Sequence, residues 1–252
     1  MWSKERHKRI LALLESSQHV SANDLPKLLG VSRETVRRDL LELEETGLID
    51  RVHGGAVLRT SKTEAPFEKR RDAQAGAKQS IARKAVSLVE PGMSILVDAG
   101  TTTAAFGHAL SKLSNFTLIT NSVEITQVLK AAEADIEVFL LGGQIVSDVP
   151  ATYGELTLSE IRRFKVDLAI ISPVALSASE GAFSYALKEA EVAKTMLGQA
   201  SRRVFLCDRT KLGETNRVQI CEANQVDMLV TDGKALPEQI APFEENGIPV
   251  LI

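Results

Sequence analysis

Ser32-Arg33-Glu34-Thr35-Val36-Arg37-Arg38-Asp39-Leu40 is the stretch that decides the fold of the first part of this chain of 252 residues. Ser32 is a favoured helix cap, and Val36, Leu40 and Leu43 recur at helical spacing after it. Because these apolar residues must face a core, the polar residues between them turn toward the outer face of the helix or its flanks. The stretch therefore predicts an amphipathic helix whose outer side is basic near its start.

Two shorter amphipathic segments precede this helix. Residues 10–14 supply the apolar face of a first helix, and Ser21 is expected to cap a second one that keeps a helical period up to Leu29. Gly30 can end the second helix in a left-handed conformation, two residues before the next cap. The sequence thus predicts a helix, a tight turn and a second helix, as in helix-turn-helix motifs.

A glycine turn follows the basic helix. Residues 48–49 and 56–58 are expected to form two short strands around it, which together make a wing. In winged helix-turn-helix domains the start of the last helix enters the major groove of double-stranded DNA, where arginine can contact guanine. We expect DNA contacts from these residues: Ser32, Arg33, Thr35, Arg37, Arg38, Arg51, His53 and Gly54. A helical hairpin with a solvated basic surface is the alternative, but caps, turn, basic helix start and wing occurring in this order favour DNA binding.

The charge is distributed unevenly along the chain. The whole sequence carries 30 Lys and Arg against 33 Asp and Glu, a net charge of −3, whereas residues 1–71 hold 14 against 11. A weakly basic small domain binds DNA loosely by itself, so we expect two or more copies to act together as a homodimer or homotetramer. No stretch approaches the roughly 20 apolar residues of a membrane span, and the first residues are too charged for a signal peptide. We therefore expect a cytoplasmic protein with no membrane partner.

Beyond residue 80 the chain alternates helical and strand-like segments, which predicts an α/β domain with a mostly parallel sheet between helices. Helices are expected over 81–89, 103–113, 123–132 and 189–200, and strands over 93–98, 116–120, 137–141, 168–171, 203–207, 228–230 and 249–252. The expected organisation is a DNA-binding domain at 1–58, a polar linker at 59–76 and a larger domain at 77–252. Cys207 and Cys221 have neither zinc nor redox spacing and are expected to be buried thiols.

Polar residues follow three of the predicted strands, at the edge where parallel sheets bind ligands. The loop from Asp98 through Gly100, Thr101, Thr102 and Thr103 leads into a helix, so hydroxyl groups and free amides converge where an anion such as phosphate is stabilised. Helix capping alone is an equally good explanation of this loop. Thr120-Asn121-Ser122 and Gly142-Gly143 follow the next two strands and indicate one shared pocket. The loop matches neither a Walker motif nor a dinucleotide fingerprint, and the sequence indicates no cofactor, metal or catalytic group.

Three further candidates lie in the last third of the chain. Glu189 and Lys194 fall on one predicted helix, where an ion pair or a solvated face is the commoner explanation. Lys211 follows a strand end, where its ammonium could meet a ligand anion. We expect all three to contribute to effector binding.

The chain resembles the DeoR/GlpR-type bacterial transcriptional regulators over essentially its whole length. The first part of the resemblance lies in Val31-Ser32, residues 35–47 and residues 51–56. The second lies in Phe67, Arg70, residues 98–102, residues 120–122, Gly142-Gly143, Gly154, Glu189, Lys194, Asp208 and Lys211. The resemblance implies a sensor domain similar in fold to ribose-5-phosphate isomerase that binds phosphorylated sugars. It further implies a repressor of a carbohydrate uptake or catabolism operon, released from its operator by a sugar phosphate.

One loop departs from the family pattern. Residues 172–179 lack the acidic residue that many members carry there, and Leu212 stands after Lys211 where phenylalanine is common. In the related isomerases the neighbouring loop holds catalytic carboxylates, so this difference argues against an enzyme. A regulator that senses a non-sugar metabolite is the main alternative, and an enzyme acting on sugar phosphates, with Glu189 as its base, is a weaker one.

Overall fold

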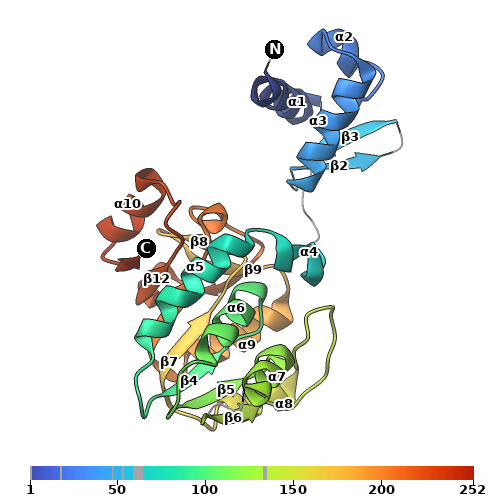
Figure 1. Cartoon of the computed structure of the whole chain (residues 1–252). Helices are drawn as coiled ribbons and strands as arrows, with labels where there is room; N and C mark the ends of the chain where they lie inside the picture. The colour runs from blue at the N-terminus through green and yellow to red at the C-terminus, as the bar shows by residue number, and fades with distance from the viewer. Residues whose placement is uncertain (1, 18, 47, 53, 59–64, 133–134) are drawn as a thin grey trace. The chain divides into compact units, whose positions relative to one another are not determined.

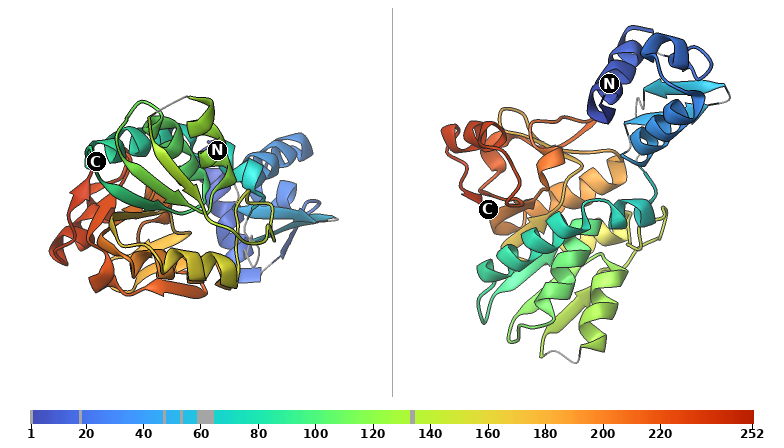
Figure 2. Two further views of the ribbon diagram at one scale, coloured as in Figure 1. Left: turned by 90° about the horizontal axis from the view of Figure 1, so that it is seen from below. Right: turned by 45° about the horizontal axis from the view of Figure 1, so that its top comes forward.

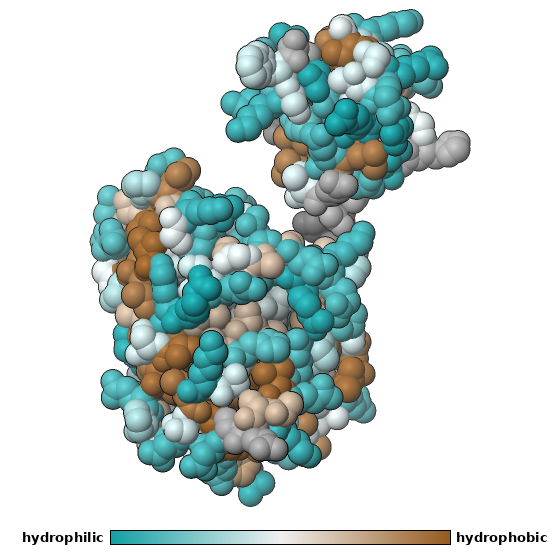
Figure 3. All heavy atoms as spheres, in the orientation of Figure 1, coloured by the Kyte–Doolittle hydropathy of each residue, from teal (hydrophilic) through white to brown (hydrophobic). Residues whose placement is uncertain are grey.

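The computed structural model describes residues 2–17, 19–46, 48–52, 54–58, 65–132 and 135–252. The chain divides into two compact units, Met1–Glu64 and Ala65–Ile252 (Figure 1). Hydrophilic residues cover most of the visible surface of both units, and apolar residues appear on it as separate patches (Figure 3). No helix among the described residues is long and apolar enough to cross a membrane.

The first unit is a winged helix-turn-helix. Its three helices pack on a small antiparallel sheet with the strand order β1-β3-β2. The elements are α1 (Ser3–Ser17), β1 (His19–Ser21), α2 (Leu25–Leu29), α3 (Arg33–Glu45), β2 (Ile49–Val52) and β3 (Gly55–Leu58). Ile10, Leu25, Val36, Leu40 and Ile49 are each at most 2 % exposed and form the centre of the core. The apolar period of the sequence therefore places α3 as predicted, with one face in the core.

Local signals explain where these helices begin and end. The Ser32 side chain accepts a hydrogen bond of 3.1 Å from the Thr35 amide and caps α3. Gly30 ends α2 with a φ of 66°, a left-handed conformation that glycine adopts without steric cost. Ser21 does not cap α2 as expected. It lies in strand β1, and α2 begins after Asp24, because pairing of β1 with β3 claims the backbone there.

The second unit is built on a seven-stranded sheet in which every neighbouring pair of strands is parallel. The strand order is β13-β12-β10-β7-β4-β5-β6. The strands are β4 (Ser94–Val97), β5 (Thr117–Thr120), β6 (Glu137–Leu140), β7 (Val166–Ile171), β10 (Ala200–Leu206), β12 (Met228–Val230) and β13 (Val250–Leu251). The parallel α/β architecture predicted from the alternating pattern is confirmed.

Helices cover both faces of this sheet (Figure 2). One face packs against α5 (Ala75–Ala85), α6 (Thr101–Leu110) and α7 (Val123–Ala131), and the other against α8 (Glu155–Ile161), α9 (Leu187–Leu197) and α10 (Pro237–Glu245). Each buried strand therefore sends alternate side chains into two cores, as Leu96 and Val97 of β4 do. A second, antiparallel sheet with the order β11-β9-β8 flanks the large one and contains β8 (Ala175–Ser177), β9 (Gly181–Ser184) and β11 (Val218–Cys221). The sequence had not predicted α8, α10 or this small sheet.

The segment expected to be a linker is partly folded. From Ala65 onward it belongs to the second unit, where it forms α4 (Phe67–Asp72) and the start of α5. The Phe67 side chain is 3 % exposed within the core on the α8 and α9 side of the sheet. Arg71 donates to Glu124 of α7 at 2.9 Å. The buried Phe67 ring and the Arg71–Glu124 contact thus hold an otherwise polar segment on the second unit.

Candidate DNA-binding and effector sites

The outer side of α3 carries the basic residues that the sequence assigned to DNA. Arg33, Arg37 and Arg38 are exposed. Arg37 is paired along the helix with Glu34, whose Oε1 lies 2.7 Å from Nη2. Both side chains of this pair are more than half exposed, so the pair is weak and can exchange for a phosphate or a base.

The opposite side of α3 is fastened to α1 by a buried ion pair. Asp39 is 2 % exposed and accepts hydrogen bonds from Arg6, at 2.6 Å from Nε and 2.8 Å from Nη2. The His7 Nε2 atom lies 3.3 Å from the same carboxylate. Sequence reasoning missed this anchor. The available signal was an aspartate on the apolar stripe of α3, between Val36 and Leu40, where a charge needs a partner.

The remaining expected DNA contacts lie at the cap and the wing. Ser32 and Thr35 share a hydrogen bond of 2.8 Å between their hydroxyl groups, so both already serve the start of α3. Arg51 on β2 is exposed, with Nη1 4.0 Å from Glu44 Oε2, and Gly54 turns the wing with a φ of 86°. His53, the other expected wing contact, lies outside the described residues.

The second site lies at the carboxyl edge of the parallel sheet. Asp98 follows β4 and is 8 % exposed, and its carboxylate accepts a hydrogen bond from the Ser172 amide, 3.1 Å from Oδ2. Burial raises the pKa of Asp98 to about 7, against the opposing effects of the Ser172 amide, the Thr103 hydroxyl and the charge of Lys211. Gly100 packs against Ser172 as well. The loop that departs from the family pattern therefore lines this site with its backbone.

Three buried polar atoms at the carboxyl edge of the sheet have no hydrogen-bond partner among the described residues, and one of them, Oγ1 of Thr231 after β12, lies away from the Asp98 loop in the strand order. The other two follow neighbouring strands. They are Oγ1 of Thr102, in the first turn of α6, and Oδ1 of Asn121, just after β5. The neighbouring Thr101 and Thr103 are also buried. Unpartnered buried polar atoms are uncommon in folded proteins and call for an explanation such as a ligand.

Two lysine side chains belong to this part of the unit, because Lys211 lies in electrostatic range of Asp98 and Lys78 lies in range of Lys211. Lys211 Nζ donates to the Pro173 carbonyl at 2.8 Å, and its charge acts on Asp98 and on Lys78. Lys78 of α5 is 5 % exposed, and burial together with the charge of Lys211 lowers its pKa to about 8. Its ammonium donates to the carbonyl groups of Arg70 and Ala73, the latter at 2.7 Å.

Sequence reasoning missed Lys78 as a member of this cluster. The signal was its position on the apolar stripe of α5, three and four residues before Ile81 and Ala82, both of which are buried. A lysine at such a position must find oxygen atoms inside the protein, and here α4 supplies them.

The polar residues at the end of β5 form hydrogen bonds within the protein. Thr120 Oγ1 donates to the Val97 carbonyl at 2.8 Å, and Asn121 Nδ2 donates to the Thr152 carbonyl at 3.0 Å. Ser122 caps α7 by accepting from the Ile125 amide at 3.2 Å. These small polar residues thus shape the edge of the sheet, and among the described residues the Asn121 Oδ1 atom has no hydrogen-bond partner.

Two other expected contributions are explained by packing. A β-carbon added at Gly143 would lie 2.6 Å from the Tyr153 carbonyl oxygen, so the close approach there is made by the protein's own backbone. The Gly142 amide donates to Glu160 at 2.6 Å.

Glu189 and Lys194 lie on α9. Glu189 accepts from the Ser184 hydroxyl at 3.1 Å, and burial raises its pKa. Lys194 is exposed on the same helix. The structure brings Glu189 into electrostatic range of Asp98.

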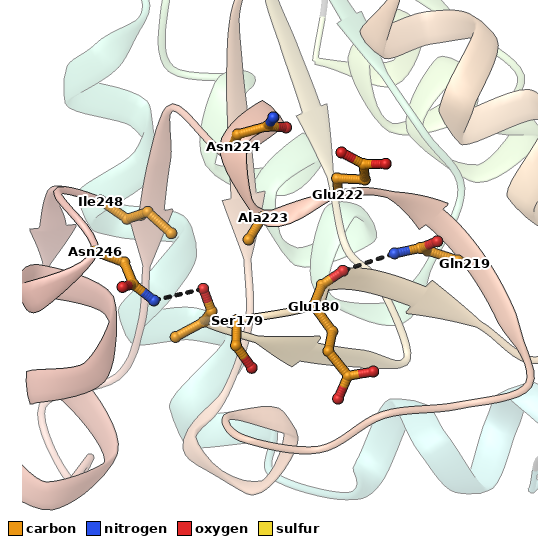
Figure 4. A pocket seen from close by; sticks show the side chains of 9 residues that line it. Ser179, Glu180, Gln219, Glu222, Ala223, Asn224, Asn246 and Ile248 are labelled. Carbon is orange, nitrogen blue, oxygen red and sulfur yellow. Dashed lines mark hydrogen bonds between the residues drawn. The ribbon is translucent and has the colours of Figure 1, made fainter.

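A cavity of about 670 Å³ lies elsewhere in the second unit. It is lined by Ala178, Ser179, Glu180, Gln219, Glu222, Ala223, Asn224, Asn246 and Ile248. Asn246 donates to the Ala178 carbonyl at 2.8 Å and Gln219 to the Glu180 carbonyl at 2.7 Å, so two of its amide groups are already engaged (Figure 4). Size alone does not make this cavity the candidate site, because the buried Lys78, the half-buried Lys211 and the unpartnered polar atoms are at the sheet edge.

A winged helix-turn-helix joined to a parallel α/β unit with a charged, buried site defines a DNA-binding transcriptional regulator with a sensor domain. Residues 6–62 match the DeoR-like helix-turn-helix domain, and residues 73–233 match the DeoR C terminal sensor domain. The chain therefore belongs to the DeoR family of transcriptional regulators.

Similar proteins extend over the whole chain. The HTH-type transcriptional repressor GlcR of Bacillus subtilis (strain 168) is 34% identical over 256 residues, covering 100% of this chain and 97% of that protein. The glycerol-3-phosphate regulon repressor of Escherichia coli (strain K12) is 31% identical over 232 residues, covering 92% of each. Among solved structures, ribose 5-phosphate isomerase A from Methanocaldococcus jannaschii matches 55% of each chain with a TM-score of 0.40 and 20% identity.

Proposed function

We propose that this protein represses a carbohydrate uptake or catabolism operon and that a phosphorylated sugar releases it from its operator. The first half of the proposal is that α3 enters the major groove of double-stranded DNA. Its exposed residues Arg33, Arg37 and Arg38 would contact base edges or phosphates, and Arg51 and Gly54 of the wing would approach the backbone. Operator binding also requires the compartment that holds the chromosome, which in a bacterium is the cytoplasm.

The single observation that carries the second half is the pair of unpartnered oxygen atoms on Thr102 and Asn121, buried at adjacent strand ends. The first turn of α6 offers free amides beside Thr102, and Lys211 supplies positive charge nearby. A phosphate suits the amides and the lysine, and sugar hydroxyl groups suit the Thr102 and Asn121 oxygen atoms. The names of the curated relatives, which include a glycerol-3-phosphate regulon repressor, support an effector of this class.

Repression and release need only a difference in affinity. An effector that binds the DNA-free arrangement better than the DNA-bound one shifts the population toward release. Lys78 gives the site a physical connection to α4, because its ammonium holds two carbonyl groups of the segment that follows the DNA-binding unit. We further propose that a homodimer or homotetramer binds DNA, so that paired domains meet paired half-sites.

The effector is tested by thermal shift of the purified protein against sugar phosphates, each paired with its unphosphorylated sugar. The variant Thr102→Val removes an unpartnered hydroxyl and keeps the side-chain shape, so it should fold normally. Its affinity for the effector should fall at least tenfold, and the effector should raise its melting temperature correspondingly less. Thr195→Val is the matched control, since the Thr195 hydroxyl donates to the Glu191 carbonyl on the far part of α9. Stabilisation by a non-phosphorylated metabolite alone would replace the sugar phosphate in the proposal.

The operator is tested by fluorescence anisotropy on DNA selected by the wild-type protein from a random library. Arg38→Ala should weaken binding at least tenfold and reduce the salt dependence, whereas Arg162→Ala, which removes the same charge from an exposed position on the sensor unit, should not. Equal affinity of Arg38→Ala and wild-type protein at matched salt would refute the placement of α3 in the groove.

A further inference from the structure

Strand β6 forms an open edge of the parallel sheet. It pairs with β5 on one side, and no described strand pairs with it on the other. The opposite edge of the sheet is β13, which is only two residues long. Short edge strands resist pairing with other chains, whereas a longer apolar edge invites it unless it is covered. β6 is therefore the edge at which the fold leaves backbone groups available (Figure 1).

The register of β6 identifies these free groups. The Glu137 amide donates to the Phe116 carbonyl, just before β5, at 3.3 Å, and the Leu141 amide donates to Thr120 of β5 at 2.8 Å. Because backbone groups of successive residues in a strand alternate in direction, those of Val138 and Leu140 point away from β5. Two residues with both an amide and a carbonyl group thus face outward from the edge.

Three of the four β6 side chains, Val138, Phe139 and Leu140, are apolar, and the fourth is the exposed Glu137. Phe139 is 40 % exposed and lies beside Phe164, with ring centroids 5.5 Å apart, and Leu140 is 44 % exposed. Leu156 of α8 is 55 % exposed and lies next to Gly142, just past the end of β6. A cavity of about 410 Å³ adjoins the strand and includes Glu160 and Arg163 among its lining residues. Contiguous exposed apolar residues rimmed by charge are typical of a protein interface.

We propose that a second copy of this chain occupies this edge, with the two β6 strands paired antiparallel across a two-fold axis at Phe139. In that register Val138 faces Leu140 of the partner strand, and each such pair exchanges both of its outward backbone hydrogen bonds. Phe139 then faces its own equivalent. If the axis lay at Val138, the outward amide and carbonyl groups of Leu140 would have no partner within β6, and an axis at Leu140 would leave those of Val138 unpaired. The axis at Phe139 therefore pairs the largest number of outward backbone groups.

The chemistry of the edge favours a copy of the same chain over an unrelated partner. A two-fold interface must be self-complementary, and this one carries a carboxylate at Glu160 and a guanidinium at Arg163 beside its apolar centre. Rotation by half a turn can therefore set unlike charges opposite each other. The inference deepens the proposed function, which requires paired DNA-binding domains, by assigning the surface that pairs them.

The oligomeric state tests this assignment in the absence of DNA and effector. Sedimentation equilibrium of the full chain should show a dimer or tetramer, and Leu140→Glu should raise the dissociation constant at least tenfold or reduce a tetramer to a dimer. Leu236→Glu is the matched control, because Leu236 is 52 % exposed at the start of α10 and should leave the assembly unchanged. Circular dichroism melts of each variant establish that the fold is retained.

Disulfide trapping tests the axis itself. Facing residues of a non-hydrogen-bonded antiparallel pair have Cα atoms about 4.5 Å apart, which a disulfide can span. Phe139→Cys should therefore form a covalent dimer under mild oxidation, whereas Leu187→Cys, at a position 64 % exposed on α9, should not. The native Cys207 and Cys221 are buried and give little background.

A monomeric wild-type chain, an assembly unaffected by Leu140→Glu, or no trapping at Phe139→Cys would each overturn the interface. Normal assembly without operator binding would instead refute the proposed function and leave the interface standing.

Discussion

We expect Asp98 to make the stability of the sensor unit fall as the pH rises from acid to neutral. Its pKa lies near 7 in the folded protein because the carboxyl group is buried, against 3.8 for an unperturbed aspartate. A carboxyl group whose pKa is higher in the folded than in the unfolded state holds its proton preferentially when folded. Its favourable contribution is therefore complete below about pH 4 and is lost as the pH rises toward 7.

The magnitude follows from the width of this window. Between pH 5 and pH 7 the unfolded chain is ionised at this position and the folded chain is largely not. Each pH unit then costs about 1.4 kcal/mol, and the loss is about 2.5 kcal/mol over the interval. For a chain of this size that corresponds to roughly 5–10 °C in the melting temperature.

Differential scanning calorimetry of wild-type protein and Asp98→Asn between pH 5 and pH 8 measures this effect. Asparagine keeps an oxygen atom that can accept the Ser172 amide but carries no titratable proton, so the other ionisable groups cancel in the comparison. The wild-type melting temperature should fall relative to that of the variant as the pH rises. Parallel curves, or a relative rise, would show that Asp98 is not the buried acid described here.

Three further outcomes are expected. Asp39→Ala removes the buried carboxylate that accepts two hydrogen bonds from Arg6 and should destabilise the DNA-binding unit by about 2 kcal/mol in urea unfolding, with no change in the sensor unit. Gly143→Ala places a β-carbon against the Tyr153 carbonyl and should cost at least about 3 kcal/mol in melting experiments, whereas Gly233→Ala, which meets no atom within 4 Å, should stay within about 1 kcal/mol of wild type. Lys78→Met removes the ammonium that holds two carbonyl groups of the α4 segment, so hydrogen exchange there should accelerate about tenfold, and unchanged exchange would contradict this contact.

The elements that sequence reasoning predicted well are those with strong local signals. Gly30 ends α2 and Ser32 caps α3, so the turn between the two helices was predictable. The spacing of the apolar residues of α3 predicted which face of the helix packs against the core. The alternation of helices and strands was sufficient for the parallel sheet. In each case the decisive contacts lie within a few residues of one another or repeat at a fixed spacing.

What sequence reasoning missed depends on contacts between distant residues. Ser21 looked like a helix cap, but pairing with β3, more than thirty residues later, placed it in a strand. The small sheet of β8, β9 and β11 has short strands. The pairing of β9 with β11 contains a β-bulge, which local sequence patterns do not predict. Lys78 joined the site because α4 folds back over it, and only the position of Lys78 on an apolar helix face pointed to burial.

The sequence indicated where the candidate effector site lies in the fold better than it indicated what each residue contacts there. The loop from Asp98 to Thr103 lies at the carboxyl edge of the sheet with Lys211 close by. The loop at Gly142-Gly143 was expected for the same reason, yet it is filled by the chain's own backbone, because glycine permits close approach by any neighbour. Which neighbour it meets is decided by the course of the chain after β6.

The burial of Phe67 determines where the sensor unit can be joined to the DNA-binding domain of another protein. A chimera that joins a foreign DNA-binding domain at residue 77 would discard an aromatic ring from the sensor core, together with the carbonyl groups that receive Lys78. The exchangeable sensor module therefore starts at Ala65, and α4 travels with the ligand-binding half. A change of operator specificity made by exchanging the DNA-binding unit therefore has to leave α4 with the sensor unit.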